Sequence, residues 1–121
     1  MDLASLRKFC LSLPHATENV QWGEDLVFKV AGKMFTVVGL DSVPNTFSFK
    51  CTPEEFAELV EREGIMPARY VARYHWVTVM SADALERVEI KRLIRKSYTL
   101  VWEKLPRKTR EALTQGTAQK K

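Results

Sequence analysis

The chain is predicted to form a single α+β domain: an antiparallel sheet with an N-terminal, a middle and a C-terminal helix packed on it. Three observations predict this class. Segments with helical and with strand periodicity follow one another, turn residues separate them, and 121 residues can bury one hydrophobic core but not two. We expect residues 1–113 to form the domain and residues 114–121 to form a flexible polar tail.

The first segment is expected to hold a helix followed by a hairpin. Asp2 is a good helix cap, and apolar residues recur at helical spacing until Pro14. From residue 26 the apolar period changes to two, and Ala31-Gly32 provides a turn into a second apolar run over residues 33–38.

A third strand and a second helix follow the hairpin. Residues 46–51 alternate between polar and apolar, which is typical of a strand with one packed face. Thr52, Pro53 and Glu55 then form the sequence of a capping box with proline at the first helical position. We expect Gly64 to end this helix in the left-handed conformation.

The remaining elements are a strand over residues 74–80 and a long helix that ends before Pro106. The helix carries apolar residues on one face. Its opposite face is basic and is flanked by Trp102. These basic residues are Lys91, Arg92, Arg95 and Lys96. Such a face is most often simply solvated, although it also provides a second cationic surface.

The charge is divided unevenly between the two halves of the chain. Residues 1–64 contain six Lys and Arg against ten Asp and Glu, whereas residues 65–121 contain thirteen against five. A local basic field attracts polyanions even when the whole molecule carries a net charge of only +4. The absence of a long apolar stretch near the amino terminus predicts a cytoplasmic protein that does not enter membranes, and its two cysteines are expected to stay free.

The best functional clue is the segment of residues 66–80, in which cationic and aromatic side chains alternate at the start of a strand. Nucleic-acid-binding proteins use cations for phosphates and aromatic faces for bases. Strand alternation places Tyr74 and Trp76 on the face opposite His75, and Lys50 and Ser48 of the neighbouring strand on the same face as Trp76. We therefore expect a basic, aromatic platform for nucleic acid. The candidate residues are Lys33, Lys50, Arg69, Tyr70, Arg73, Tyr74, His75 and Trp76.

Two other readings of this segment stay open. Tyr74 and Trp76 are equally compatible with plain core packing, because aromatic side chains carry large hydrophobic areas. Alternatively, the open sheet face docks a protein or small ligand, and the basic residues only form its rim. Salt dependence separates nucleic acid from an apolar partner. The sequence does not indicate an oligomeric state.

Catalysis and metal binding are not expected. Cys51 and His75 would be a conceivable nucleophile and base, but no third residue orients them. The chain has two histidines and two cysteines that are far apart in sequence, so it lacks a metal-ligand motif. Its five scattered glycines do not form a phosphate-binding loop. We predict no enzyme activity, no cofactor and no metal.

Several short motifs occur in a characteristic order. They are Lys33-Met34-Phe35, Ser48-Phe49-Lys50-Cys51 with Pro53, Pro67 with Tyr70, His75-Trp76 with Thr78-Val79, and Ser97-Tyr98. From about Leu3 to Leu113 the chain resembles the MmcQ/YjbR family of small bacterial proteins. The resemblance implies a one-domain α+β fold similar in layout to secretion chaperones, and family members are described as candidate DNA-binding proteins. This chain departs from the family pattern at Arg73-Tyr74 and Val77.

Overall fold

Six strands form one antiparallel sheet in the computed structural model, which describes the backbone of residues 1–81 and 83–119 and the side chains of 1–81 and 83–115. The order of the strands in the sheet is β1-β2-β3-β4-β6-β5. The elements are α1 (Leu3–Ser12), β1 (Ala16–Gln21), β2 (Asp25–Val30), β3 (Lys33–Gly39), β4 (Thr46–Lys50), α2 (Pro53–Leu59), β5 (Ile65–Pro67), η1 (Ala72–Tyr74), β6 (Trp76–Val79), α3 (Arg87–Glu103) and α4 (Arg107–Gln119).

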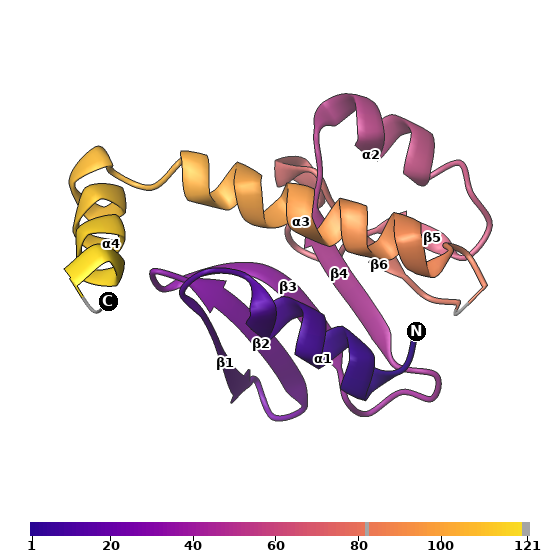
Figure 1. Cartoon of the computed structure of the whole chain (residues 1–121). Coiled ribbons are helices and arrows are strands. Elements are labelled where there is room, and N and C mark those ends of the chain that lie inside the picture. Colours follow the sequence, from indigo (N-terminus) through magenta and orange to yellow (C-terminus); the bar gives the residue numbers. More distant parts are fainter. Residues whose placement is uncertain (82, 120–121) are drawn as a thin grey trace.

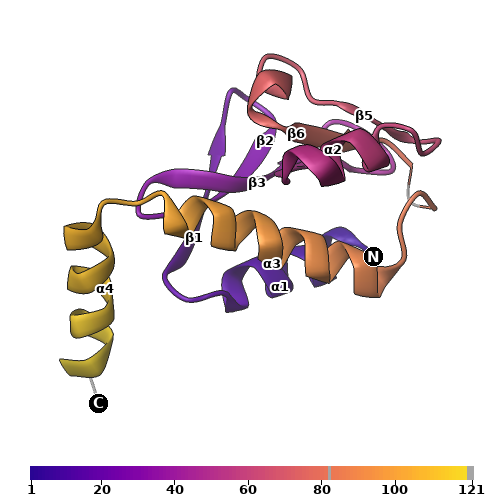
Figure 2. The ribbon, with the colours of Figure 1, turned by 90° about the horizontal axis from the view of Figure 1, so that it is seen from above.

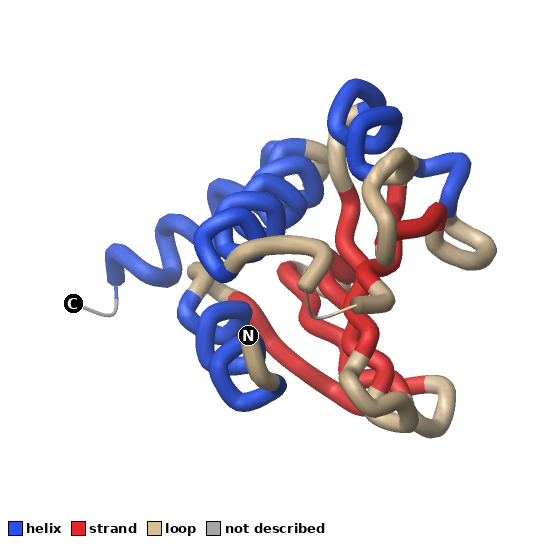
Figure 3. The backbone as a smooth tube through the Cα atoms, turned by 90° about the vertical axis from the view of Figure 1, so that its right-hand side faces the viewer, coloured by secondary structure: helices blue, strands red, loops and turns tan. Residues whose placement is uncertain are grey.

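The helices α1, α2 and α3 lie on one side of the sheet (Figures 1 and 2). The view in Figure 3 shows the same division, with the helices on one side and most strands on the other. We call the helix-bearing side the covered face; it presents Phe28, Phe49 and Val77 to the core. The opposite side is the open face, which presents Val37, Ser48 and Thr78. The single α+β domain expected from the sequence is thus confirmed.

The hairpin of β2 and β3 has the predicted turn, and it contains a bulge that determines which side chains of β3 lie on which face of the sheet. Ala31 and Gly32 both have positive φ, 49° and 78°, as a two-residue hairpin turn requires. Phe28 pairs with Thr36 but Lys29 pairs with Met34, so Phe35 is an extra residue. Phe35 packs in the core, and Met34 is left on the open face.

The first helix begins where the sequence predicts. The Asp2 carboxylate accepts a hydrogen bond from the Ser5 backbone N–H at 2.8 Å, which caps α1. Leu6 and Cys10 of this helix are buried in the core. Arg7 donates from Nε to Glu18 of β1 at 2.7 Å, so α1 is also tied to the edge of the sheet.

The second helix has the predicted capping box but ends earlier than expected. The Thr52 hydroxyl accepts from the Glu55 N–H and the Glu55 carboxylate accepts from the Thr52 N–H, both at 3.1 Å. The helix ends at Leu59, not at Gly64. Gly64 does have φ of +87°, but it forms the entry to β5, where a Cβ atom would lie 2.9 Å from Cβ of Ser81.

The long helix α3 crosses the covered face over β2, β3 and β4 (Figure 1). Its apolar stripe is buried as predicted, including Leu93 and Ile94. The buried hydroxyl of Ser97 donates to the Phe35 carbonyl at 2.7 Å and accepts from the Lys50 N–H at 2.9 Å. This hydroxyl therefore joins β3 and β4 just beyond Thr36 and Phe49, the last pair in the register of these two strands.

Three elements do not follow from the sequence pattern. The edge strand β1 is mostly polar and partly exposed, and β5 has only three residues, so neither shows clear alternation. The helix α4 is rich in polar residues and stands away from the sheet (Figure 2). It continues through Gln119, into the segment predicted as a polar tail. Lys120 and Lys121 lie outside the described residues, and flexibility of the tail stays a prediction.

Within the described part of the chain, no helix combines the length and apolar character that crossing a membrane requires. Cys10 and Cys51 are both free and buried.

Candidate functional site on the open face of the sheet

The open face carries a groove of about 820 Å³. We call it the open-face groove. Its lining comes from the strands, from the turn after β1 and from the connection between β5 and β6, and no described side chain of α1 to α4 contributes to it. The lining residues are Trp22, Asp25, Met34, Val37, Gly39, Thr46, Ser48, Met66, Pro67, Ala68, Arg69, Tyr70, Val71, Trp76, Thr78 and Met80.

Strand register builds the floor of the groove. Residues that are paired across antiparallel strands point to the same face, and Val37, Ser48, Thr78 and Met66 form one such row across β3, β4, β6 and β5. The hydroxyls of Ser48 and Thr78 hydrogen-bond to each other at 2.7 Å. Because one of the two hydroxyl donors is already used in this bond, the middle of the floor loses less hydrogen bonding to water when apolar material covers it.

One wall of the groove is the connection between β5 and β6. The Ala68 N–H donates to the Trp76 carbonyl at 3.0 Å, which holds the start of this connection against β6. Tyr70 follows with φ of 67°, a left-handed conformation that is uncommon for a residue with a Cβ atom. Its side chain is 91% exposed. The groove is therefore bordered by an aromatic ring that reaches into solvent.

The structure brings together three of the eight residues predicted as the nucleic-acid site. Arg69, Tyr70 and Trp76 all line the open-face groove. The predicted face of Trp76 is confirmed, because Lys50 is its partner across β4 and β6 and Ser48 lines the same groove. Trp76 is only 5% exposed, however, so its ring forms part of the floor. Of the two readings that the sequence left open for Trp76, this burial contradicts the exposed stacking platform and agrees with packing.

The predicted strand over residues 74–80 begins too early, and this changes the position of Tyr74 and His75. Tyr74 ends the short helix η1, and His75 has φ of 66° before β6 starts at Trp76. Tyr74 is 51% exposed and lies beside the Arg73 guanidinium, 4.9 Å from its ring centroid. Tyr74 and Trp76 therefore do not share one strand face.

His75 points toward α2, where its ring meets Phe56 edge-on with the centroids 5.7 Å apart. Its carbonyl accepts from the Cys51 backbone N–H at 2.8 Å. The Cys51 thiol donates to the same carbonyl at 3.3 Å. Burial raises the pKa of Cys51 to about 12, and the charge of Glu55 contributes. A thiol with this pKa is protonated at neutral pH, so the pair does not provide a thiolate nucleophile.

The two lysines of the predicted site lie away from the groove lining. Lys33 is exposed at the hairpin end of β3. Burial lowers the pKa of the Lys50 ammonium, and the charge of Lys104 after α3 lowers it further. Lys50 shares the strand face of its partner Trp76 but does not line the groove, and its ammonium lies near that of Lys104.

Sequence reasoning missed the methionines. Met34, Met66 and Met80 line the groove, and the chain has four methionines in all. Each adjoins or belongs to a strand. Their positions in the sequence alone do not separate a groove lining from ordinary core packing, because the bulge at Phe35 and the length of β5 decide their direction. Trp22, 68% exposed after β1, was not singled out either.

An acidic group lies on the β2 side of the groove. Burial raises the pKa of the Asp25 carboxyl, and the charge of Asp41 raises it further. Among the side chains that the structure describes, no basic group forms an ion pair with Asp25. The groove thus has a carboxyl group on this side and the guanidinium of Arg69 on the β5–β6 side.

The basic side of α3 is turned away from the sheet, and contacts with α1 and α2 occupy part of it. Lys91 and Arg95 lie 5.8 and 5.4 Å from the centroid of the Phe9 ring of α1. Arg92 forms an ion pair with Glu55 of α2 at 3.5 Å. These contacts give part of the predicted second cationic surface a structural role.

The fold and the groove define a class of protein: a one-domain α+β protein with a helix-covered and an open sheet face. The chain belongs to the YjbR family, whose family model matches residues 11–100. This result confirms the resemblance found in the sequence motifs. The match identifies the family and says nothing about an activity.

Relatives and solved structures agree with this assignment. The chain is 29% identical to the uncharacterized protein YjbR of Escherichia coli (strain K12) over 119 residues, which is 95% of this chain and 99% of that protein. The crystal structure of Deinococcus radiodurans protein DR2400 has a TM-score of 0.86 and 30% identity, covering 93% of this chain and 88% of that one. A Pseudomonas syringae protein has the same fold, with a TM-score of 0.68 and 22% identity over 83% of this chain and 98% of that one.

Proposed function

We propose that this protein is a non-catalytic binding module that holds an apolar segment of a partner protein in the open-face groove. The observation that carries the proposal is the concentration of three of the four methionines in one groove. Methionine side chains are unbranched and polarizable, and they adapt to apolar partners of different shape. Proteins that bind varied apolar segments use such surfaces.

The solvent exposure of apolar side chains in the groove supports its role as a binding surface. Met66 is 49% exposed, and Trp22, Tyr70 and Met80 of the same groove are also exposed. Large apolar side chains that gather in one place on a surface are a usual mark of an interaction site. Trp76 provides a broad, rigid floor beneath them.

The dimensions of the groove suit a short extended chain. Its lining spans five strands, from β2 to β5, which corresponds to roughly 19 Å at about 4.8 Å between neighbouring strands. About six residues of extended chain have this length. The volume of about 820 Å³ is within the range of roughly 300–1,000 Å³ that is usual for binding pockets. The carboxyl group of Asp25 favours a segment with a basic residue or another donor on that side.

A second candidate function is nucleic-acid binding through the connection between β5 and β6. The observation that favours it is the joint exposure of Arg69, Tyr70, Arg73 and Tyr74 within six residues. Cations and rings in such a segment can contact phosphates and bases without Trp76. This second candidate function uses four of the eight residues that the sequence predicted for a nucleic-acid site.

The experiment is a selection of peptides from a random displayed library, followed by affinity measurements on synthetic peptides. We expect enriched peptides with several apolar residues. Met66→Asp should weaken their binding by about tenfold or more, because a charge replaces apolar contact area. The matched control is Val88→Asp, since Val88 is an exposed apolar residue of α3, 77% exposed, outside the groove. Equal affinity of the peptides for wild type and Met66→Asp would overturn the groove assignment.

Salt separates the two candidate functions. Peptide affinity should change little between about 50 and about 200 mM salt, whereas nucleic-acid affinity should fall steeply over the same range. Binding of single-stranded or duplex DNA that disappears in the double variant Arg69→Ala, Arg73→Ala, together with a failed peptide selection, would replace the first candidate by the second.

A further inference from the structure

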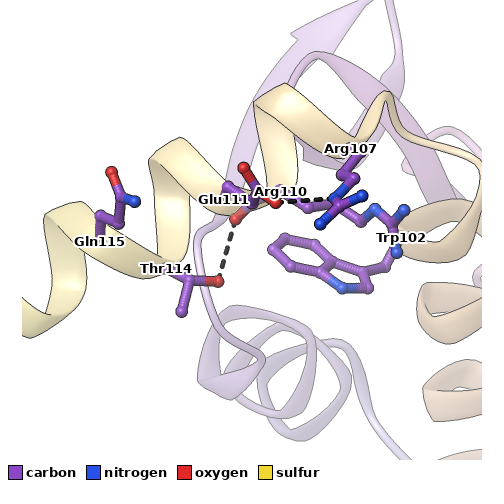
Figure 4. A pocket seen from close by; sticks show the side chains of 6 residues that line it. All are labelled: Trp102, Arg107, Arg110, Glu111, Thr114 and Gln115. Atoms are coloured by element: carbon purple, nitrogen blue, oxygen red, sulfur yellow. Dashed lines mark hydrogen bonds and ion pairs between the residues drawn. The ribbon is translucent and has the colours of Figure 1, made fainter.

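A second cavity, of about 670 Å³, lies where α4 follows α3, and α2, β4 and β6 contribute none of its lining. We call it the α3–α4 cavity. It is lined by Trp102 of α3 and by five polar residues of α4: Arg107, Arg110, Glu111, Thr114 and Gln115. Figure 4 shows the guanidinium groups of Arg107 and Arg110 close to one another and next to the indole ring of Trp102.

The side of α4 that faces this cavity is polar. Positions 107, 110, 111 and 114 are spaced as one face of a helix. A helix that only packs on its own domain turns an apolar face inward. Here the inward face carries two guanidinium groups, a carboxylate and a hydroxyl opposite an aromatic ring. This composition is that of a binding site for a polar ligand.

Hydrogen bonding leaves donors available in the cavity. Arg107 donates from Nε to Glu111 at 2.8 Å, and no other described side chain accepts from its two terminal nitrogens. The Nε of Arg110 is covered from solvent and has no hydrogen-bond partner. Covered donors without an acceptor are rare and unfavourable in folded proteins. Because Arg110 lines the cavity, an acceptor on a ligand would satisfy this donor once the guanidinium turns toward the cavity.

The local charge favours an anion. Residues 103–111 contain four Lys and Arg and two Glu. Lys104, between the two helices, also lies close enough to Lys50 to lower the pKa of that ammonium. The lining itself holds two guanidinium groups and one carboxylate, and this excess of positive charge raises the local concentration of anionic ligands.

We propose that the α3–α4 cavity binds a phosphate monoester carried by a planar ring, of the size of a mononucleotide. Arg107 and Arg110 hold the phosphate, because guanidinium groups match phosphate oxygens in a two-pronged geometry. The Trp102 indole, which already stacks with His15 and Tyr98 at centroid distances of 6.1 and 6.3 Å, contacts the ring with the part that lines the cavity. The cavity volume is in the range of small-molecule sites and is larger than a phosphate ion alone requires. This site is separate from the open-face groove and does not depend on the function proposed for it.

The experiment is isothermal titration calorimetry of the full chain with adenosine monophosphate, adenosine and inorganic phosphate. We expect adenosine monophosphate to bind about tenfold or more tightly than either fragment, because each fragment fills only half of the site. Arg110→Gln should weaken binding of the monophosphate by about tenfold or more. Lys108→Gln is the matched control, since it removes the same charge from α4 outside the cavity lining, and it should stay within about twofold.

Three results would overturn the proposal. The first is no measurable heat with adenosine monophosphate. The second is equal weakening by Arg110→Gln and Lys108→Gln, which would mean that only diffuse charge acts. The third is a single-stranded DNA oligonucleotide that binds more than about tenfold tighter than the monophosphate and competes with it, which would assign the cavity to nucleic acid. Met66→Asp should leave monophosphate binding unchanged, so a failure of this proposal is distinguishable from a failure of the groove.

Discussion

The two faces of the sheet are built from the same six strands but from different side chains. The covered face presents phenylalanines and valines that are completely buried, among them Phe28, Phe49 and Val77. The open face presents methionines that are half-buried or exposed, and a groove remains above them. The covered face is thus closed by α1 and α3, whereas the open face keeps apolar surface in contact with solvent.

This difference teaches which face is responsible for stability and which is available for binding. Stiff aromatic and β-branched side chains pack to one arrangement, so they specify the fold. Flexible methionines around a groove specify little by themselves and can adapt to another molecule. We therefore expect substitutions on the covered face to change the free energy of unfolding strongly, and substitutions on the open face to change it weakly.

The largest expected effect is that of Phe49→Ala on the covered face. Phe49 is completely buried next to Phe47, so its truncation should lower the free energy of unfolding by about 3–5 kcal/mol. Met66→Ala on the open face should lower it by less than about 1 kcal/mol, because this side chain is already half in solvent. Urea unfolding followed by circular dichroism measures both. Similar losses in the two variants would contradict the division between the faces.

A smaller effect is expected for the hydroxyl that joins β3 and β4. Ser97→Ala removes one partner from the Phe35 carbonyl and one from the Lys50 N–H, which should lower the free energy of unfolding by about 1–3 kcal/mol. The control on the open face is Ser48→Ala. Its hydroxyl pairs only with Thr78 in a half-buried position, so we expect a loss of about 1 kcal/mol or less. The same urea titrations measure both variants. If Ser48→Ala lowered the free energy of unfolding as much as Ser97→Ala, the open face would be as tightly packed as the covered face.

The smallest effect should appear as a dependence of stability on pH. The folded protein raises the pKa of Asp25 above its ordinary value of 3.8. The folded state therefore holds this proton more tightly than the unfolded state, and stability falls as pH rises from 3.8 through the raised pKa. An asparagine side chain does not titrate, so the variant Asp25→Asn lacks this decrease in the free energy of unfolding. Relative to wild type, the variant should therefore become more stable as pH rises, and the difference between the two should disappear in acid.

The contrasting group for this test is Glu89 of α3. The Arg62 guanidinium holds the pKa of Glu89 below its ordinary value of 4.5. Its contribution to stability is present above 4.5 and is lost as pH falls through the lowered pKa. Asp25→Asn and Glu89→Gln should therefore change the pH profile in opposite directions when unfolding is measured from acidic pH, below the ordinary pKa values of 3.8 and 4.5, up to neutral pH. Parallel profiles would disprove the assignment of the raised pKa to Asp25.

Local signals in the sequence were sufficient for most of the fold. Asp2, the capping box at Thr52 and the Ala31-Gly32 turn each depend on neighbours within a few residues, and all three are present. The family motifs likewise identified the family. The edge strand β1 and the helix α4 were missed, because polar elements with little burial leave weak periodicity.

The candidate site was predicted only in part. Arg69, Tyr70 and Trp76 do gather at one groove. The sequence left open whether Trp76 is exposed or packed, because its burial depends on residues from β4, β5 and the connection after β5 that surround it. The start of β6 was also placed two residues early, because η1 and the left-handed His75 leave no mark in the alternation of side chains.

The sequence by itself determined the class of fold, the family, the caps and turns, and which face of each strong helix is apolar, because these follow from short-range propensity and periodicity. Only the tertiary structure decided that three methionines and a buried tryptophan meet on the open face, and that two arginines of α4 meet Trp102. The physical reason is that strand register, the bulge at Phe35 and the direction of α4 after Pro106 bring distant residues together. Spacing along the chain does not encode such distances.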